Sequence, residues 1–133
     1  MMQEMVNKKA LEGYGRNAVE SEVNFASPHR IIQMLMEGAL GKIATAKGCI
    51  ERGDSAEKVR QITWGMNIIN GLRASLDHQQ GGDIASNLDS LYEYMGRRLQ
   101  ESSINNDVTG LDEVVTLLTE VKSGWDEIPP EFH

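Results

Sequence analysis

The sequence predicts an all-α protein, specifically an antiparallel four-helix bundle with an additional short N-terminal helix. Four stretches carry apolar residues spaced three and four apart, which is the period of an amphipathic helix. Turns of only a few residues separate these stretches, and no stretch shows the alternation and hairpin turns of paired strands. Because short connections favour antiparallel neighbours, the four stretches predict an up-and-down bundle.

The length of 133 residues and the 40% apolar content suit a single domain with one core. We expect this domain to have four parts. They are a short N-terminal helix over 1–15, an extended linker over 16–26, the four-helix bundle over 27–127 and a C-terminal tail over 128–133.

The N-terminal helix is expected over residues 3–14, with Met5, Val6 and Leu11 on its apolar side. The segment Gly13–Gly15, which contains Tyr14, ends it. The residues that follow lack a helical period, so they predict an extended segment that lies on a surface.

The first bundle helix is expected to begin at Ser27-Pro28 and to end near Arg52. Serine is a favoured N-cap because its hydroxyl accepts a hydrogen bond from a free backbone N–H. Proline suits the first helical position, where the missing N–H costs nothing. The apolar stripe of this helix comprises Ile32, Leu35, Ala39, Ile43, Ala46 and Ile50.

The second bundle helix follows Gly53 and is expected to end near His78. The segment Asp54–Glu57 resembles a capping box in its aspartate form. One apolar side comprises Val59, Ile62, Met66, Ile69 and Leu76, and a second strip comprises Trp64, Ile68 and Leu72. A helix with so wide an apolar arc must face two neighbours, or one neighbour and a partner.

The last two helices are expected over 83–104 and 110–127, after turns at 79–82 and 105–107. The third helix is predicted to place Ile84, Leu88, Leu91, Met95 and Leu99 inward. The fourth has the cleanest period of the chain, formed by Leu111, Val114, Leu118, Val121 and Trp125. Pro129-Pro130 ends regular structure.

Two of the three tyrosines, Tyr92 and Tyr94, stand in one short run of the third helix beside Leu91. A tyrosine has an apolar ring and a polar tip, so it suits the border between a core and a wet surface. Since a catalytic site would concentrate acids, bases or nucleophiles, this run predicts a contact surface instead.

Composition narrows the setting and the partners. No apolar stretch approaches the ~20 residues that span a bilayer, and the acid at Glu4 argues against a signal peptide. The single cysteine, Cys49, cannot form an internal disulfide, so we expect a cytoplasmic protein without membrane insertion. The net charge of −7 makes a nucleic-acid partner unfavourable. Acidic residues are concentrated in 77–133, either for solubility or to select a partner.

The residues needed for catalysis or metal binding are not in the right places. Bundles that hold two metal ions between carboxylates use Glu-x-x-His on inward faces. The residues three before His29, His78 and His133 are alanine, serine and proline, so none supplies that carboxylate. No phosphate loop surrounds Gly41-Lys42. We therefore expect no enzyme activity, no cofactor and no metal.

Several segments, taken in order, resemble the FliS family of flagellar export chaperones. They are Ala26–Gly38, Asn67–Leu72, Leu76-Asp77, Gly81–Leu88, Leu91–Met95, Arg97-Arg98, Trp125 and, about a dozen residues before Ser27, Tyr14. The resemblance covers roughly residues 11–127. Two positions depart from the family pattern: Met36 stands where an aromatic residue is common, and Gly96 interrupts a good helix.

The resemblance implies a cytoplasmic chaperone that binds the disordered C-terminal segment of flagellin and keeps it monomeric until export through the flagellar type III apparatus. It also suggests that the N-terminal helix covers a binding groove. Other flagellar export or regulatory proteins are further expected partners, and the free protein is expected to be a monomer or a weak homodimer. The predicted partner-binding residues are Leu11, Tyr14, Ile68, Leu72, Leu91, Tyr92 and Tyr94.

The sequence leaves alternatives open for the N-terminal helix and for the function. The N-terminal helix either competes with the partner through Leu11 and Tyr14 or contacts the partner directly. A helical adaptor or regulator that binds another flagellar protein is the alternative function. A helical enzyme or metal carrier is a third possibility, against which the missing Glu-x-x-His pairs argue.

Overall fold

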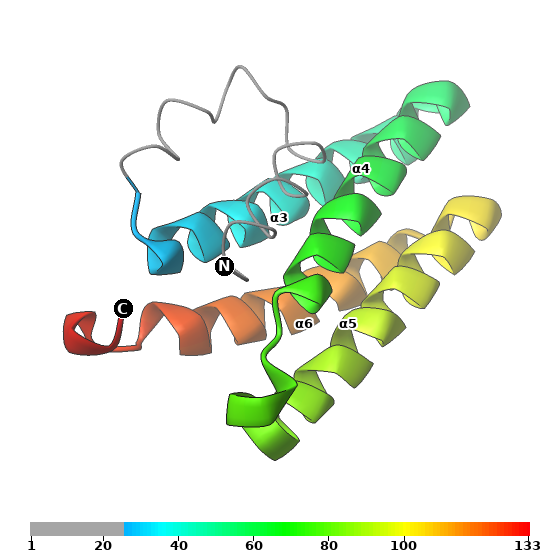
Figure 1. The fold of residues 1–133 in the computed structure, drawn as a ribbon. Coiled ribbons are helices and arrows are strands. Elements are labelled where there is room, and N and C mark those ends of the chain that lie inside the picture. The colour runs from blue at the N-terminus through cyan, green and yellow to red at the C-terminus, as the bar shows by residue number, and fades with distance from the viewer. Residues whose placement is uncertain (1–25) are drawn as a thin grey trace.

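The computed structural model describes residues 26–133, and this part of the chain is helical with no strand (Figure 1). Its elements are α3 (Pro28–Arg52), α4 (Ser55–Ala74), α5 (His78–Asn105), α6 (Val108–Asp126) and a short 3-10 helix, η1 (Pro130–Phe132). The helix expected over residues 3–14 and the linker up to residue 25 lie outside the described residues. The all-α prediction is confirmed for the described part.

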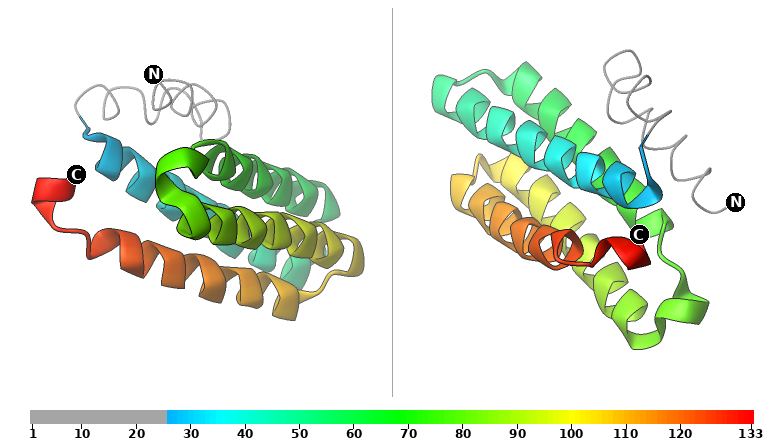
Figure 2. Two further views of the ribbon diagram at one scale, coloured as in Figure 1. Left: turned by 60° about the horizontal axis from the view of Figure 1, so that its bottom comes forward. Right: turned by 90° about the vertical axis from the view of Figure 1, so that its left-hand side faces the viewer.

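The four long helices form a bundle around one apolar core. α3 packs against α4 and α6, and α5 packs against the same two helices. Both views in Figure 2 show the four helices side by side. The core contains residues from every helix, among them Leu35, Ile43, Ile62, Ile69, Met95, Leu99, Leu111 and Leu118. The stripes read from the sequence therefore account for most of the buried side chains.

The helix ends follow the capping residues of the sequence. The Ser27 hydroxyl accepts a hydrogen bond from the Arg30 backbone N–H at 3.1 Å. Gly53 ends α3 with φ 74°, a left-handed conformation that is unstrained for glycine. Asp54 caps α4 through the Glu57 N–H at 3.3 Å, so the expected N-cap is confirmed.

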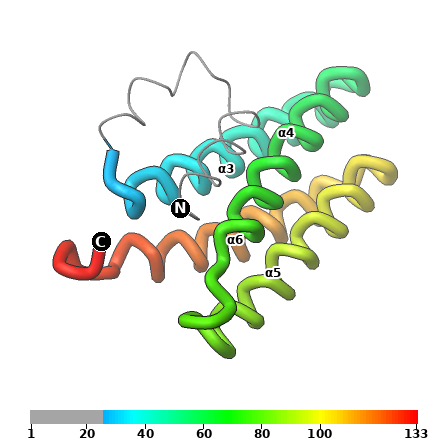
Figure 3. The backbone as a smooth tube through the Cα atoms, viewed as in Figure 1, coloured from blue at the N-terminus to red at the C-terminus, as the bar shows by residue number. Residues whose placement is uncertain are grey.

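The connection between α4 and α5 differs from the expected one. α4 ends at Ala74, not near His78, and residues 79–82 are not a simple turn. Asp77 caps a first helical turn that starts at His78, and Gly82 then breaks the helix with φ 50° and ψ −124°. The bend is visible in the tube of Figure 3. Because an Asp N-cap and a permissive glycine lie so close together, the chain forms one helical turn and then changes direction.

Two side chains that were expected to face inward do not. Ile84 is 72% exposed and Val59 is 50% exposed. Ile84 lies just after the bend at Gly82, where α5 leaves the core, so Ala85 is buried in its place. Val59 lies in the first turns of α4, and the neighbouring Lys58 is buried instead. The Lys58 ammonium donates to the Ser103 carbonyl oxygen at 2.7 Å, near the end of α5.

α5 and α6 approach closely near the start of α6. Gly110 is buried there against Ser102 and Arg98 of α5. A Cβ at Gly110 would collide with the Ser102 hydroxyl oxygen and lie 3.0 Å from the Arg98 guanidinium carbon. This contact is possible because residue 110 has no side chain, which is a close-approach role for glycine.

Candidate functional site

An apolar cleft lies at the end of the bundle where α3 and α5 begin and where α4 and α6 end. It has a volume of about 770 Å³. Its lining includes Ile31, Ile32, Met36, Leu72, Leu76, Ile84, Leu88, Tyr92, Val121, Trp125, Ile128 and Phe132. Every element of the described chain therefore contributes to one concave surface, which is the usual form of a binding site.

The floor of the cleft is part of the hydrophobic core. Met36, Leu72 and Tyr92 are each at most 3% exposed and come from three different helices. Burial raises the pKa of the Tyr92 hydroxyl to about 12, because the ionised form would lose its hydration. The floor is thus rigid and uncharged, and it offers mainly dispersion contacts to a ligand.

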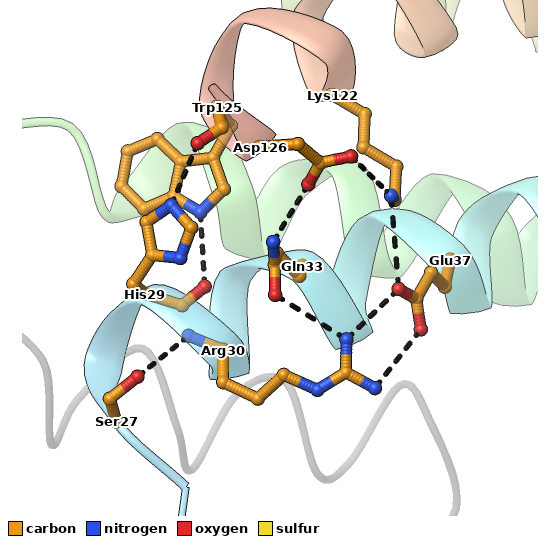
Figure 4. A network of polar contacts seen from close by, with 8 residues as sticks. All are labelled: Ser27, His29, Arg30, Gln33, Glu37, Lys122, Trp125 and Asp126. Atoms are coloured by element: carbon orange, nitrogen blue, oxygen red, sulfur yellow. Dashed lines mark hydrogen bonds and ion pairs between the residues drawn. The ribbon is translucent and has the colours of Figure 1, made fainter. Parts of the chain in front are cut away.

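One wall of the cleft joins the start of α3 to the end of α6 through His29 and Trp125. The His29 ring Nε2 donates to the Trp125 carbonyl oxygen at 2.7 Å, and the Trp125 indole Nε1 donates to the His29 carbonyl oxygen at 3.0 Å. The two rings stack with centroids 4.8 Å apart. This reciprocal pair is drawn in Figure 4. Two hydrogen bonds and a stack hold two helix ends that are far apart in the sequence.

Polar contacts extend this wall toward solvent (Figure 4). The Gln33 amide donates to the Asp126 carboxylate at 2.8 Å, and the Lys122 ammonium lies 2.7 Å from the same carboxylate. The Lys122 bond, and then the Gln33 bond, lower the pKa of Asp126. On α3 the Arg30 guanidinium pairs with Glu37 at 3.0 Å. Of these contacts, the Gln33–Asp126 hydrogen bond joins α3 to α6, whereas the Lys122–Asp126 and Arg30–Glu37 pairs each lie within one helix. Exposed pairs of this kind contribute little to stability.

A second polar cluster lies between α5 and α6. The Tyr94 hydroxyl donates to Glu113 at 2.8 Å, and the Arg98 guanidinium binds the same carboxylate at 2.8 Å and Asp107 at 3.2 Å. The Arg98 bond, and then the Tyr94 bond, lower the pKa of Glu113. The hydrogen bond from the Tyr94 hydroxyl to Glu113 is also the main reason that the pKa of Tyr94 is raised. The Tyr94 hydroxyl therefore joins α5 to α6.

The structure brings together two of the predicted partner-binding residues. Leu72 and Tyr92 both line the cleft. Ile68 is fully buried in the core beneath, and it does not line the cleft. Leu11 and Tyr14 lie outside the described residues. Their assignment stays a prediction.

The remaining two predicted residues lie apart from the cleft. Leu91 is half-buried and packs against the core. Tyr94 lies in the cluster with Glu113, on a different face of α5 from Tyr92. Neither lines the cleft, although both are accessible enough to touch a partner that reaches beyond it.

Sequence reasoning did not select several cleft residues as site residues: His29, Ile84, Trp125 and Phe132. Ile84 and Trp125 were assigned to core stripes, because an apolar residue at helical spacing looks the same whether it faces a core or a cleft. No local pattern in the sequence connects His29 with Trp125, its partner 96 positions away. Phe132 follows a proline pair, where the helical period has ended.

Within residues 26–133, no group of three or more His, Cys, Asp or Glu side chains is placed to hold a metal ion. None of the helices in the same range is long and apolar enough to cross a membrane.

The described residues form an all-helical bundle with an apolar cleft at one end, a shape that can accept the apolar face of another segment. Comparison with known proteins identifies the family. The model of the family described as "Flagellar protein FliS" matches residues 10–131. The chain therefore belongs to the FliS family, and the resemblance read from the sequence is confirmed.

Individual relatives agree over almost the whole chain. It is 49% identical to "Flagellar secretion chaperone FliSB" of Pseudomonas aeruginosa, over 93% of this chain and 98% of the relative. It is 40% identical to the proteins named "Flagellar secretion chaperone FliS" of Vibrio cholerae, over 93% and 91%, and of Salmonella typhimurium, over 96% and 95%. The family is one of chaperones, not of enzymes.

Proposed function

We propose that this chain is a cytoplasmic chaperone of flagellar secretion. It binds the disordered C-terminal segment of flagellin, prevents premature polymerisation and aids delivery to the flagellar type III export apparatus. The observation that carries the proposal is the apolar cleft at the end of the bundle, found in a chain whose relatives are named flagellar secretion chaperones.

The chemistry of the cleft fits a segment that folds as it binds. Such a segment loses chain entropy on ordering, so it needs a broad apolar surface to offset that loss. The buried floor at Met36 and Leu72 and the exposed rim at Ile84 together supply such a surface. An amphipathic helix laid in the cleft would place its apolar face on the floor, and its polar face would stay in water.

The proposal includes two features of the whole fold. We infer that residues 27–127 form one domain whose consecutive helices run antiparallel, since the cleft collects the starts of α3 and α5 with the ends of α4 and α6. Residues 1–15 add a helix to it. Through Leu11 and Tyr14 this helix either covers the groove or grips the partner.

Calorimetric titration with a flagellin C-terminal peptide tests the function. We expect one-to-one binding with a negative heat-capacity change, because apolar surface is buried. The variant Ile84→Ala removes a cleft side chain that is 72% exposed, so the fold is retained. It should weaken binding about tenfold, as expected for an interface side chain worth about 1–2 kcal/mol.

The matched control is Ile104→Ala. Ile104 is also on α5 and is 73% exposed, yet it does not line the cleft. Its replacement should leave the affinity unchanged. A peptide that gives no heat with the full chain would overturn the proposed function, and equal losses in the two variants would remove the cleft from it. Deleting residues 1–15 separates the two roles of the N-terminal helix: tighter binding indicates a cover, and weaker binding indicates a contact.

A further inference from the structure

The C-terminal turn, Ile128–His133, folds back toward the start of α3 and forms one side of the cleft mouth. Its 3-10 helix is closed by hydrogen bonds from the Phe132 N–H to the Pro129 carbonyl oxygen at 2.9 Å and from the His133 N–H to the Pro130 carbonyl oxygen at 3.1 Å. In Figures 1 and 2 this turn lies next to the beginning of α3. The turn is therefore an ordered part of the site.

Ring stacking anchors the turn. The His133 ring lies on the His29 ring with centroids 3.6 Å apart and planes within 5° of parallel. His29 also stacks on Trp125, whose backbone carbonyl it binds. The His133 ring nitrogen Nε2 donates to the Ile128 carbonyl oxygen at 2.8 Å, which closes the turn on itself. These contacts hold the turn against the wall that joins α3 to α6.

Phe132 is held at the mouth of the cleft but is not buried in it. The residue lines the cleft and is 74% exposed. Ile84, which lines the same cleft from α5, is 72% exposed. An exposed apolar side chain at the rim becomes buried only when a partner binds over it. Its burial then stabilises the complex, and the core does not have to rearrange. The cleft thus has a buried apolar floor and an exposed apolar rim, with rim residues from two separate elements.

We infer that the C-terminal turn contacts the bound partner and that the Phe132 side chain packs against the bound segment. This inference rests on the proposed function, and it goes beyond it by assigning a binding role to the turn that follows the last long helix. The occupant is the flagellin segment, bound as an amphipathic helix whose apolar face touches Phe132 and Ile84 together.

Charge at the cleft sets the kind of side chain that suits the bound helix. Glu120 lines the cleft, and Glu131 precedes Phe132 in the turn. Neither carboxylate has an ion pair among residues 26–133. A bound helix that carries basic side chains beside its apolar face would pair with these acids, whereas an acidic helix would be repelled.

The test uses the same calorimetric titration with the full chain. Phe132→Ala should weaken binding of the flagellin peptide about tenfold, and Phe132→Leu, which retains apolar bulk, should restore most of the affinity. Because the ring is exposed, neither substitution should change the melting temperature. The control Ile104→Ala removes an equally exposed apolar side chain outside the cleft and should leave the affinity unchanged.

The outcomes separate this inference from the proposed function. If Ile84→Ala weakens binding while Phe132→Ala leaves it unchanged, the turn is not part of the site and the inference is wrong. Tighter binding by Phe132→Ala would also overturn it, because the turn would then be a lid that competes with the partner. If the unmodified chain does not bind the peptide, the proposed function fails and this inference fails with it.

Discussion

The two tryptophans of the chain offer a matched test of the wall between α3 and α6. The Trp125 indole N–H donates to the His29 carbonyl oxygen at 3.0 Å. The Trp64 indole N–H is buried and has no acceptor in the described part of the chain. Replacing each residue with phenylalanine removes an indole N–H and a similar amount of ring surface. Only Trp125→Phe breaks a hydrogen bond.

The expected magnitude follows from this contrast. A protein hydrogen bond contributes about 0.5–1.5 kcal/mol net, whereas a buried donor without a partner is unfavourable by about 1–3 kcal/mol. Trp125→Phe loses the contribution of one hydrogen bond, whereas Trp64→Phe removes the cost of a buried donor without a partner. The Lys42 ammonium lies 3.6 Å from the Trp64 ring centre, and weakening that contact costs about 0.5 kcal/mol. We therefore expect Trp125→Phe to be less stable than Trp64→Phe by about 1–4 kcal/mol.

Urea unfolding followed by circular dichroism measures this difference without relying on the fluorescence that both variants alter. With a urea dependence of about 2 kcal/mol per molar, the two midpoints should differ by roughly 0.5–2 M. The slopes should be equal, because the two variants expose the same surface on unfolding. If Trp64→Phe is as destabilised as Trp125→Phe, or more so, the assigned hydrogen bond to His29 does not hold the two helix ends together.

Two further predictions concern packing and ionisation. Gly110→Ala should lower the free energy of unfolding by about 1–3 kcal/mol, because the new Cβ would press on Ser102 and Arg98. Gly124→Ala, in open space on the same helix, should raise it by about 0.5–1 kcal/mol, and chemical denaturation of the pair compares them. In the folded protein Tyr92 should ionise only near pH 12, as measured by the ultraviolet absorbance of tyrosinate. Because the folded pKa is raised above the unfolded value of 10, the neutral hydroxyl contributes full stability below pH 10. That contribution, on the order of 2–3 kcal/mol, is lost as the pH rises toward 12. Ionisation of all three tyrosines near pH 10 in a folded protein would contradict the burial of Tyr92.

Local chemistry explains why the helices could be predicted. A helix start depends on a side chain that reaches a backbone N–H two or three residues away, so Ser27 and Asp54 are readable as caps. A helix end at Gly53 depends on the conformational freedom of one residue. The spacing of Leu111, Val114 and Leu118 predicts one buried face, and all three are fully buried.

The connection at the cleft was harder to predict because two local signals compete there. Asp77 starts a helical turn, while Gly82 permits a sharp change of direction. Which signal dominates depends on where α5 must lie to pack against α4 and α6. The same choice turns Ile84 outward, so the residue lines the cleft rather than the core.

The sequence by itself determined the helical class, the approximate extent of the helices and the family, because these depend on short-range periodicity, on capping and on residues in order. Only the tertiary structure decided which apolar residues form the floor and the rim of the cleft. The pairing of His29 with Trp125, and the stacking of His133 on His29, join positions that have no local relation in the chain. Their proximity results from the packing of α3 against α6, and packing depends on every helix at once.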